Sequence, residues 1–230
     1  LVDSFRVALA NGTIVTASAQ EHPDLYWALR GGTGGNFGVV LQVTYRMQRL
    51  DQVWAWAISW DAVHATQVLT LMQAGYMKTG APDALGYMMN LGFQNGVPVY
   101  MVQGMFCGSR EDGLAAIAPL MAIPSAQLLV DKTGTYPDMN VWLEDHPYTL
   151  PDNLPDGIAE TKASGYINTR LSPADWQRII DYFKTSPNPW SLAYLEPYGG
   201  AINRYPLADS AFVHRLSLIH ISEPTRRRGI

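Results

Sequence analysis

Five glycines within the eight residues 31–38 constrain this chain more than any other feature of its sequence. Because glycine has no Cβ, such a loop can adopt positive φ angles and can bring bare backbone N–H groups close to a bound phosphate or flat cofactor. An amphipathic segment at 23–30, which opens with a proline suited to a first helical turn, precedes the loop, and a β-branched segment at 39–47 follows it. The sequence therefore predicts a helix, a glycine loop and a strand in this order.

The order of these elements argues against a dinucleotide-binding Rossmann unit. The spacing of Gly32, Gly34 and Gly38 approaches the dinucleotide fingerprint, but that fingerprint follows a strand and opens a helix. Here the glycines follow a helix and precede a strand, so an NAD(P) site is disfavoured. A tight helix-to-strand turn without any ligand is the second interpretation of the loop.

A short turn near the start of the chain predicts a β-hairpin. Asn11-Gly12 is a favoured two-residue hairpin turn, and alternating apolar residues flank it at Phe5–Leu9 and Ile14–Ala17. Asn11-Gly12-Thr13 is also an N-glycosylation sequon, which has a meaning only in a secreted protein. We favour the turn.

From Asp51 onward the pattern changes to strands with helices between them. Trp54, Trp56 and Trp60 recur on one face of a strand, which is typical of a core. Further elements are predicted from apolar spacing and turn residues: strands at 85–93 and 97–106, helices at 62–77 and after Ser172, and a strand at 191–198. Residues 131–164, rich in Pro, Asp and Asn, are expected to form a long, partly irregular connection that lines a binding site.

Composition excludes several classes of function. The 230 residues are 47% hydrophobic and 16% charged, enough for a sizeable core. The net charge is −4 and no basic cluster occurs before residue 226, so we expect no nucleic-acid partner. The apolar runs are too short to span a bilayer, and dispersed histidines such as His146 and His214 lack metal-ligand spacing, so we expect neither a membrane nor a metal. Cys107, the single cysteine, is expected to be buried.

Two stretches of the sequence resemble a known family. Residues 24–32 (DLYWALRGG), continuing into 34–40 (GGNFGVV), are similar to the closing segment of the FAD-binding domain in berberine-bridge-enzyme-like oxidases. These proteins are FAD-linked oxidoreductases of the vanillyl-alcohol-oxidase fold group, whose FAD-binding domain is of the PCMH type. Residues 196–203 (EPYGGAIN) and 212–215 (FVHR) are similar to a strand, a turn and a Pro-His-Arg stretch of the same family.

The resemblance implies an α+β fold with two parts. Residues 1–50 are expected to be the C-terminal piece of a PCMH-type FAD-binding domain, and residues 51–215 a substrate domain of antiparallel sheet covered by helices. We expect most of the flavin domain to lie outside this sequence and the chain alone to be inactive. Residues 216–230 depart from the family, and we expect them to be a non-native tail that packs poorly.

The same resemblance implies an FAD site and a substrate site. The residues expected to contact FAD, largely through the backbone, are Gly34, Gly35, Asn36, Gly38 and Val40. Tyr198 is the expected catalytic base, and orientation of the substrate is its equally weighted alternative role. Glu196, on the same strand face by alternation, is the second catalytic candidate and is suited to accept hydrogen bonds from a polyol.

The expected function is therefore that of an FAD-dependent oxidoreductase. It oxidises a hydroxyl-bearing small molecule, a sugar or a secondary metabolite, by hydride transfer to FAD, with oxygen as the acceptor and hydrogen peroxide as the product. The alternatives are a non-catalytic binding module that retains the substrate domain and, with less support, an NAD(P)-dependent dehydrogenase. The sequence leaves localisation and oligomeric state open.

Overall fold

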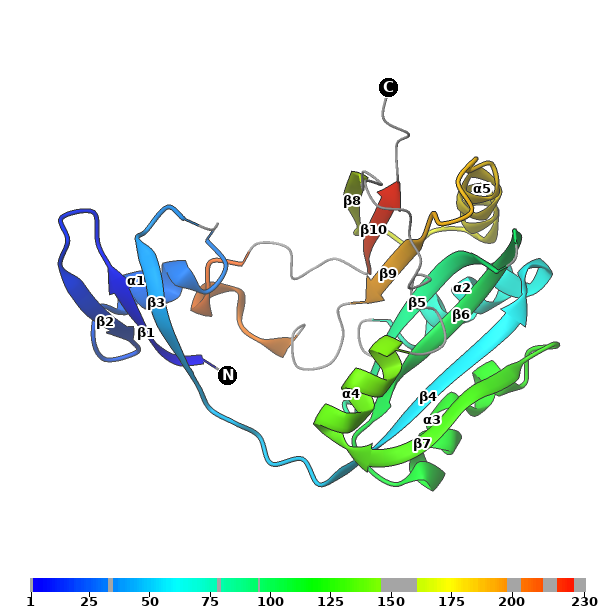
Figure 1. The fold of residues 1–230 in the computed structure, drawn as a ribbon, viewed down its shortest axis with the longest axis horizontal. Helices are drawn as coiled ribbons and strands as arrows, with labels where there is room; N and C mark the ends of the chain where they lie inside the picture. The colour runs from blue at the N-terminus through cyan, green and yellow to red at the C-terminus, as the bar shows by residue number, and fades with distance from the viewer. Residues whose placement is uncertain are drawn as a thin grey trace. The chain divides into compact units, whose positions relative to one another are not determined.

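The chain divides into two compact units, residues 1–49 with 204–215, and residues 50–203 with 216–230 (Figure 1). The computed structural model describes residues 2–32, 35–77, 80–94, 96–145, 161–197, 204–212 and 219–225. Residues 204–212 belong to the first unit, where Trp27 and Arg30 hydrogen-bond to their backbone.

The first unit is a small sheet with one helix packed on it. Strands β1 (Val2–Ala8), β2 (Ile14–Ser18) and β3 (Val39–Tyr45) are antiparallel in the order β2-β1-β3. Phe5 and Val7 of β1 are buried against helix α1 (Pro23–Leu29), whose Pro23 stands at its start as predicted. Phe5 pairs with Ala17 across the predicted hairpin.

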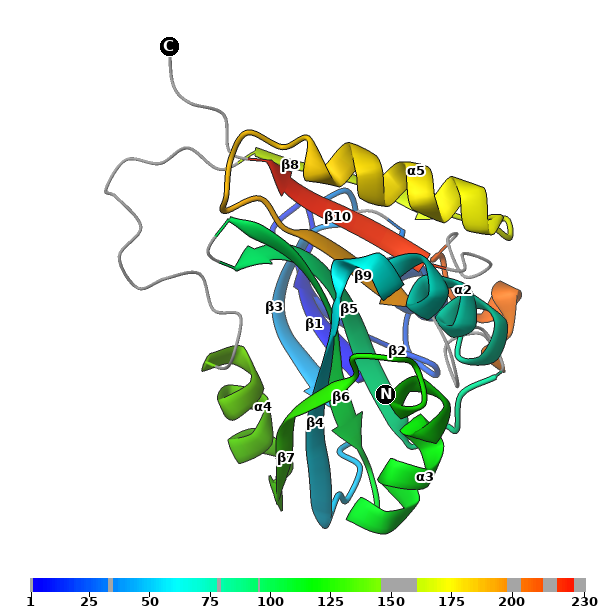
Figure 2. The same ribbon diagram turned by 90° about the vertical axis from the view of Figure 1, so that its right-hand side faces the viewer.

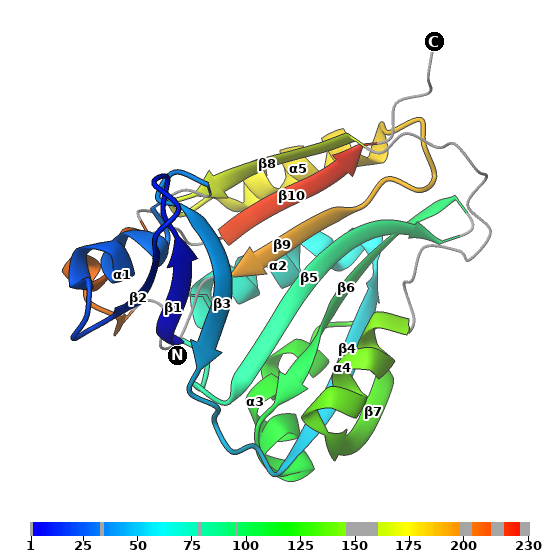
Figure 3. The same ribbon diagram turned by 60° about the vertical axis from the view of Figure 1, so that its left-hand side comes forward.

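The second unit contains a larger antiparallel sheet in the order β7-β4-β6-β5-β9-β10-β8 (Figure 3). Its strands are β4 (Gln52–Asp61), β5 (Leu85–Gln94), β6 (Val97–Phe106), β7 (Gln127–Thr135), β8 (Thr161–Ile167), β9 (Ala193–Pro197) and β10 (Ile219–Thr225). β5 and β6 form the predicted hairpin. Neighbouring strands place paired side chains on the same face, so the register assigns each strand residue to one face.

Helices cover the two faces of this sheet unequally (Figure 2). The helices of the second unit are η1 (Ala62–His64), α2 (Ala65–Gly75), α3 (Arg110–Met121), α4 (Tyr136–Asp145) and α5 (Pro173–Lys184); η2 (Leu207–Asp209) belongs to the first unit. α2, α3 and α5 pack on one face around the fully buried Trp54, Trp56 and Trp176. α4 packs on the opposite face, where Met139 and Leu143 contact β4, β6 and β7 residues. We call this opposite side of the sheet the α4 face.

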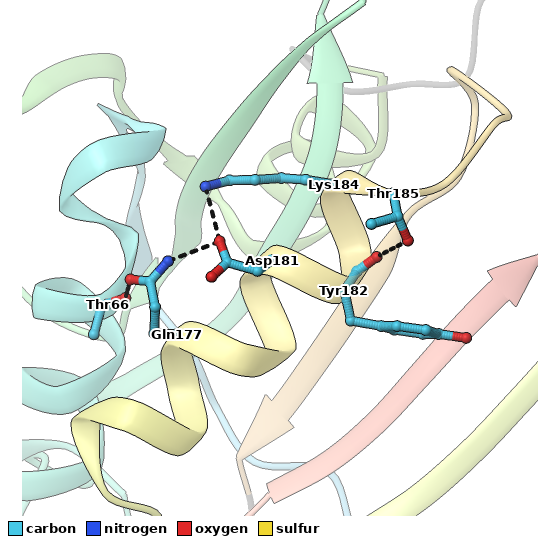
Figure 4. A network of polar contacts seen from close by, with 6 residues as sticks. All are labelled: Thr66, Gln177, Asp181, Tyr182, Lys184 and Thr185. Atoms are coloured by element: carbon cyan, nitrogen blue, oxygen red, sulfur yellow. Dashed lines mark hydrogen bonds and ion pairs between the residues drawn. The ribbon is translucent and has the colours of Figure 1, made fainter.

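Polar contacts hold α5 on the helical face of the sheet. Ser172 caps its N-terminus and forms a capping box with Asp175, as the sequence pattern indicates. Thr66 of α2 donates to Gln177 at 2.5 Å, and Gln177 donates to Asp181 at 2.9 Å (Figure 4). This chain of side chains joins α2 to α5.

Three local expectations differ from the structure. Residues 131–145 are regular, because β7 pairs with β4 and α4 buries apolar side chains on the sheet; residues 146–160 lie outside the described part. Residues 219–225 form β10 and pair with both β8 and β9, which satisfies backbone groups that would otherwise stand at two strand edges. Cys107 is exposed, because β6 ends one residue before it.

Candidate functional site

The glycine loop lies directly between α1 and β3, in the order that the sequence predicts. α1 ends at Leu29, and Arg30 closes it with a backbone hydrogen bond to Trp27. The loop then reaches β3 at Val39. Gly34, an expected FAD contact, lies outside the described residues.

The described glycines of this loop separate into two kinds. A Cβ on Gly31 would lie 2.5 Å from the Cβ of Phe212, and one on Gly38 would lie 2.6 Å from the carbonyl oxygen of Ala8. Packing within the first unit therefore accounts for both. Gly35 has a φ of +79°, and among the described residues no atom lies within 4 Å of its Cβ position. Its left-handed backbone faces open space, which fits the close approach of a ligand to backbone N–H groups.

Other expected FAD contacts also border open space. Asn36 is exposed, and Val40 at the start of β3 is 42% exposed. The neighbouring Val39 is 66% exposed, unusual for an apolar strand residue. The hairpin-turn glycines Gly12 and Gly96 share the positive φ and the open Cβ position of Gly35, so the geometry of Gly35 is compatible with both a tight turn and a cofactor contact.

A second group of polar side chains lies on the α4 face of the large sheet. Asn90 of β5 is only 4% exposed, and among the described residues its Oδ1 has no hydrogen-bond partner. Gln103 of β6 likewise has a buried Oε1 without a partner in the described part of the chain. Asn90 pairs with Met101 and Gln103 with Met88, so the two amides are diagonal neighbours on one face.

These buried acceptors need donors that the described residues do not provide. An unpaired polar atom in a protein interior costs about 1–3 kcal/mol, so most native structures avoid it. Five further buried polar atoms without a partner among the described residues belong to tryptophans and tyrosines of the helical-face core. Asn90 and Gln103 differ from these in that their two acceptors lie on adjacent strands and on the opposite face of the sheet. We did not predict either residue from the sequence. The sequence pattern that could have indicated them is a single amide side chain within each of two apolar strand segments.

Glu196 belongs to the same face. Tyr194 pairs with Asn90 across β5 and β9, and Glu196 lies two residues farther along β9, so both side chains share the face of Asn90. Glu196 also pairs with His220 of β10. Glu196 thus lies on the face that carries the two amide oxygens without a partner among the described residues. Tyr198, the expected catalytic base, lies outside the described residues, as do His146 and His214.

Tyrosines on the helical face are poor candidates for a base. Burial raises the pKa of Tyr76 to about 12 and that of Tyr100 well above its ordinary value. Burial and the nearby Tyr76 together raise the pKa of Tyr87 as well. These hydroxyls stay protonated at neutral pH and belong to the packed core.

A cavity of about 540 Å³ lies in the first unit beside Tyr26, Arg30 and Tyr205. Its charged groups already have protein partners: Arg30 binds three acceptors and Arg46 pairs with Asp3 at 2.8 Å. Within the described residues no cluster of His, Cys, Asp or Glu suits a metal ion. In the same part of the chain no helix is long and apolar enough to cross a membrane.

Comparison with known proteins finds relatives that are named FAD-linked oxidoreductases or oligosaccharide oxidases. No protein-family model matches the chain. An uncharacterised FAD-linked oxidoreductase of Bacillus subtilis is 24% identical over 208 residues, which cover 90% of this chain and 44% of that protein. A xylooligosaccharide oxidase of Thermothelomyces thermophilus is 26% identical over 233 residues, which cover 93% of this chain and 44% of that protein.

The fold comparison agrees with the sequence comparison. The structure of the berberine-bridge-enzyme-like protein 1 of Physcomitrella patens matches with a TM-score of 0.84 at 23% identity, over 99% of this chain and 50% of that chain. The chain is therefore similar in sequence to proteins named as FAD-linked oxidoreductases and oxidases, and similar in fold to a berberine-bridge-enzyme-like protein. The expected α+β class, with antiparallel sheet and helices, is confirmed. The chain spans about half the length of the relatives that it matches.

Proposed function

We propose that this chain is part of an FAD-dependent oxidoreductase that oxidises a hydroxyl group of a carbohydrate, with oxygen as the final acceptor. The observation that carries the proposal is the pair of buried, unpartnered acceptors, Asn90 Oδ1 and Gln103 Oε1, on the α4 face. A carbohydrate presents several hydroxyl donors in a fixed arrangement, which suits fixed acceptors on adjacent strands. The likeness to a xylooligosaccharide oxidase supports this substrate class.

The glycine loop is proposed to hold the cofactor. Gly35 offers its backbone to open space, and Asn36 and Val40 border it with exposed side chains. Gly34 and Gly38 complete the proposed set. FAD held there would supply an acceptor for the hydride of the substrate and the means to pass the electrons on to oxygen as hydrogen peroxide.

The protein residues orient the substrate and take its proton. Asn90, Gln103 and Glu196, which share one face of the sheet, accept hydrogen bonds from hydroxyls of the substrate. Tyr198 takes the proton from the hydroxyl that is oxidised. A phenol of ordinary pKa near 10 needs a cationic or hydrogen-bonding neighbour for this role at neutral pH.

Peroxide release tests the proposal. The protein that contains this chain is incubated in air with xylo-, cello- and chito-oligosaccharides, and hydrogen peroxide is measured. We expect peroxide with at least one oligosaccharide and a higher KM in the Gln103→Leu variant. Val63→Ala, at a residue 79% exposed on η1, is the control and leaves the kinetics unchanged.

The binding-module alternative gives a different result in the same assay. A module without catalysis binds an oligosaccharide in calorimetry, yet it releases no peroxide and leaves any bound flavin oxidised. Binding of all oligosaccharides at equal strength by wild type and Gln103→Leu would contradict the assignment of the α4 face to the substrate.

A further inference from the structure

A methionine thioether binds one of the two amides on the α4 face. β5 and β6 are neighbours in the large sheet (Figure 3), and Met88 of β5 lies directly opposite Gln103 of β6. The Nε2 of Gln103 donates a hydrogen bond to the Sδ of Met88 at 3.6 Å. Because sulfur is larger than oxygen and a weaker acceptor, this distance is normal for an N–H···S bond. The amide of Gln103 is thus bound at its nitrogen.

The sulfur determines which end of the amide faces β5. A thioether has lone pairs but no hydrogen to donate, so it binds the nitrogen end of Gln103 and not the oxygen end. The Oε1 therefore occupies the other corner of the planar amide, where it is the buried acceptor without a partner in the described part of the chain. Without the sulfur, the two orientations of the amide would differ less in free energy. Met88 thus keeps the oxygen of Gln103 available for a hydroxyl donor.

The methionines around Gln103 differ in exposure. Met88 and Met105 are half-buried, whereas Met101 is 1% exposed and belongs to the apolar cluster that α4 covers. Met105 lies on the same face of β6, two residues beyond Gln103, and within the described residues its sulfur accepts no hydrogen bond. Met105 is therefore a matched comparison for Met88, with similar exposure but without the amide.

The thioether of Met88 is open to one reaction whose oxidant the proposed function supplies. Hydrogen peroxide converts an accessible thioether to a sulfoxide. A lone pair of Sδ attacks one peroxide oxygen, the O–O bond breaks and an S–O bond forms. The proton on the transferred oxygen passes to the departing hydroxide, which leaves as water. Sulfur is oxidised by two electrons, and the peroxide is reduced by two.

Oxidation of Met88 would displace the amide of Gln103. In a sulfoxide the oxygen carries the negative charge, so it replaces sulfur as the acceptor. An N–H···O bond takes about 2.9–3.0 Å between its heavy atoms, and the S–O bond adds to that length. The present 3.6 Å between Sδ and Nε2 cannot hold both in line, so the amide must move or lose its partner.

We propose that Met88 is a positioning residue for the substrate acceptor Gln103 and the site at which hydrogen peroxide modifies the α4 face. Its thioether keeps Gln103 Oε1 available to the substrate, and oxidation to the sulfoxide removes that arrangement and weakens substrate binding. The product of the enzyme thus limits its affinity for the substrate. The inference rests on the proposed function, which assigns the α4 face to an oligosaccharide and makes hydrogen peroxide the product.

The side-chain amide signals of Gln103 test the contact without any catalysis. Nitrogen–proton correlation spectra of this chain are recorded for wild type, Met88→Leu and Met105→Leu, and the signals are assigned by their loss in Gln103→Leu. Leucine removes the sulfur at nearly constant volume. We expect the Nε2 proton signals to move in Met88→Leu and to stay in Met105→Leu. Unmoved signals in Met88→Leu would overturn the proposal.

Peptide mass spectrometry of this chain after treatment with hydrogen peroxide tests the modification site. We expect Met88 to be oxidised at least about fivefold faster than Met101, because susceptibility follows exposure. A Met88 that resists oxidation as fully as the buried Met101 would contradict the proposal.

Peroxide release from xylo-, cello- and chito-oligosaccharides by the protein that contains this chain tests the effect on the substrate. We expect Met88→Leu to raise KM by about threefold to tenfold with little change in kcat, because one hydrogen bond to the substrate is weakened. Met105→Leu leaves KM unchanged. In a Gln103→Leu background, Met88→Leu has no further effect, because it acts through that amide. Equal KM in Met88→Leu and wild type, or additive increases in the double variant, would contradict the positioning role.

Pre-treatment of the same protein with hydrogen peroxide tests the consequence of oxidation. Wild type and Met105→Leu should show the rise in KM, methionine sulfoxide reductase should reverse it, and Met88→Leu should not respond. An unchanged KM in wild type with oxidised Met88 would contradict the proposal. Absence of peroxide release from untreated wild type with every oligosaccharide would contradict the proposed function instead, and the amide signals of Gln103 would then decide whether Met88 positions it.

Discussion

Replacement of Asn90 by leucine tests whether the Asn90 amide stabilises the fold or serves to bind a ligand. Leucine has the same number of side-chain heavy atoms as asparagine and the same branching, but no polar atom. In the ligand-free protein the substitution removes a 4% exposed residue whose Oδ1 has no partner among the described residues. The leucine would pair across the strands with Met101 of the adjacent β6.

The expected effect on stability is favourable. A buried polar atom left unpaired costs about 1–3 kcal/mol, and an apolar group of similar shape removes that cost. After allowance for imperfect packing we expect a gain of about 1–2 kcal/mol in the free energy of unfolding. For a chain of this size the gain corresponds to a rise of about 2–8 °C in Tm.

Thermal and urea unfolding of wild type and Asn90→Leu measure this difference. Asn90→Asp is the matched control, since it keeps the shape but places a carboxyl in a buried site. Burial raises the folded-state pKa of that carboxyl above its unfolded value, so the control loses stability as pH rises through the folded pKa. A loss of more than about 1 kcal/mol in Asn90→Leu would refute the reasoning, because it would mean that Asn90 stabilises the ligand-free fold.

Three further outcomes follow from contacts elsewhere in the structure. Gln73→Ala should destabilise the second unit by about 2–4 kcal/mol in urea unfolding, because the buried amide both donates to and accepts from the backbone of Leu171, each at 2.8 Å. Hydrogen bonds from Arg110, and a further one from Trp54, lower the pKa of Asp131. The wild type should therefore be more stable than Asp131→Asn at neutral pH, and this advantage should disappear as pH falls through the folded-state pKa of Asp131. A stability difference that stays constant in urea unfolding across a pH series would count against this prediction. We expect this chain to self-associate through β3, an edge strand of the sheet formed by the described residues, and Leu41→Lys, at a residue 50% exposed on β3, should reduce that association in analytical ultracentrifugation.

Much of the fold could be predicted because turn residues, helix caps and apolar spacing in the sequence agree with the turns, helix ends and buried residues of the structure. The tryptophans of β4 alternate, the Asn11-Gly12 turn fixes a hairpin, and Ser172 caps α5 as its type suggests. Residues 131–145 were predicted to be irregular because their composition is polar. They form a strand that pairs with β4 and a helix that buries only Met139 and Leu143 among its described side chains. The structure of this segment therefore depends on tertiary pairing, which local composition does not report.

The site was harder to predict than the fold. The glycine loop is contiguous in sequence, so its position followed from local pattern alone. Asn90 and Gln103 come together only through the register of β5 against β6, which no local pattern specifies. The contact between residues 204–212 and α1 could not be predicted either, because Arg30 binds Tyr205 and Asp209 across most of the length of the chain.

The visible absorbance of bound flavin tests the central claim most directly. The protein that contains this chain is purified, freed of oxygen and mixed with an oligosaccharide that gives peroxide in air. The account predicts a flavin spectrum that bleaches on mixing and returns when oxygen is admitted. A protein without flavin absorbance, or a flavin that stays oxidised with every oligosaccharide, would contradict it.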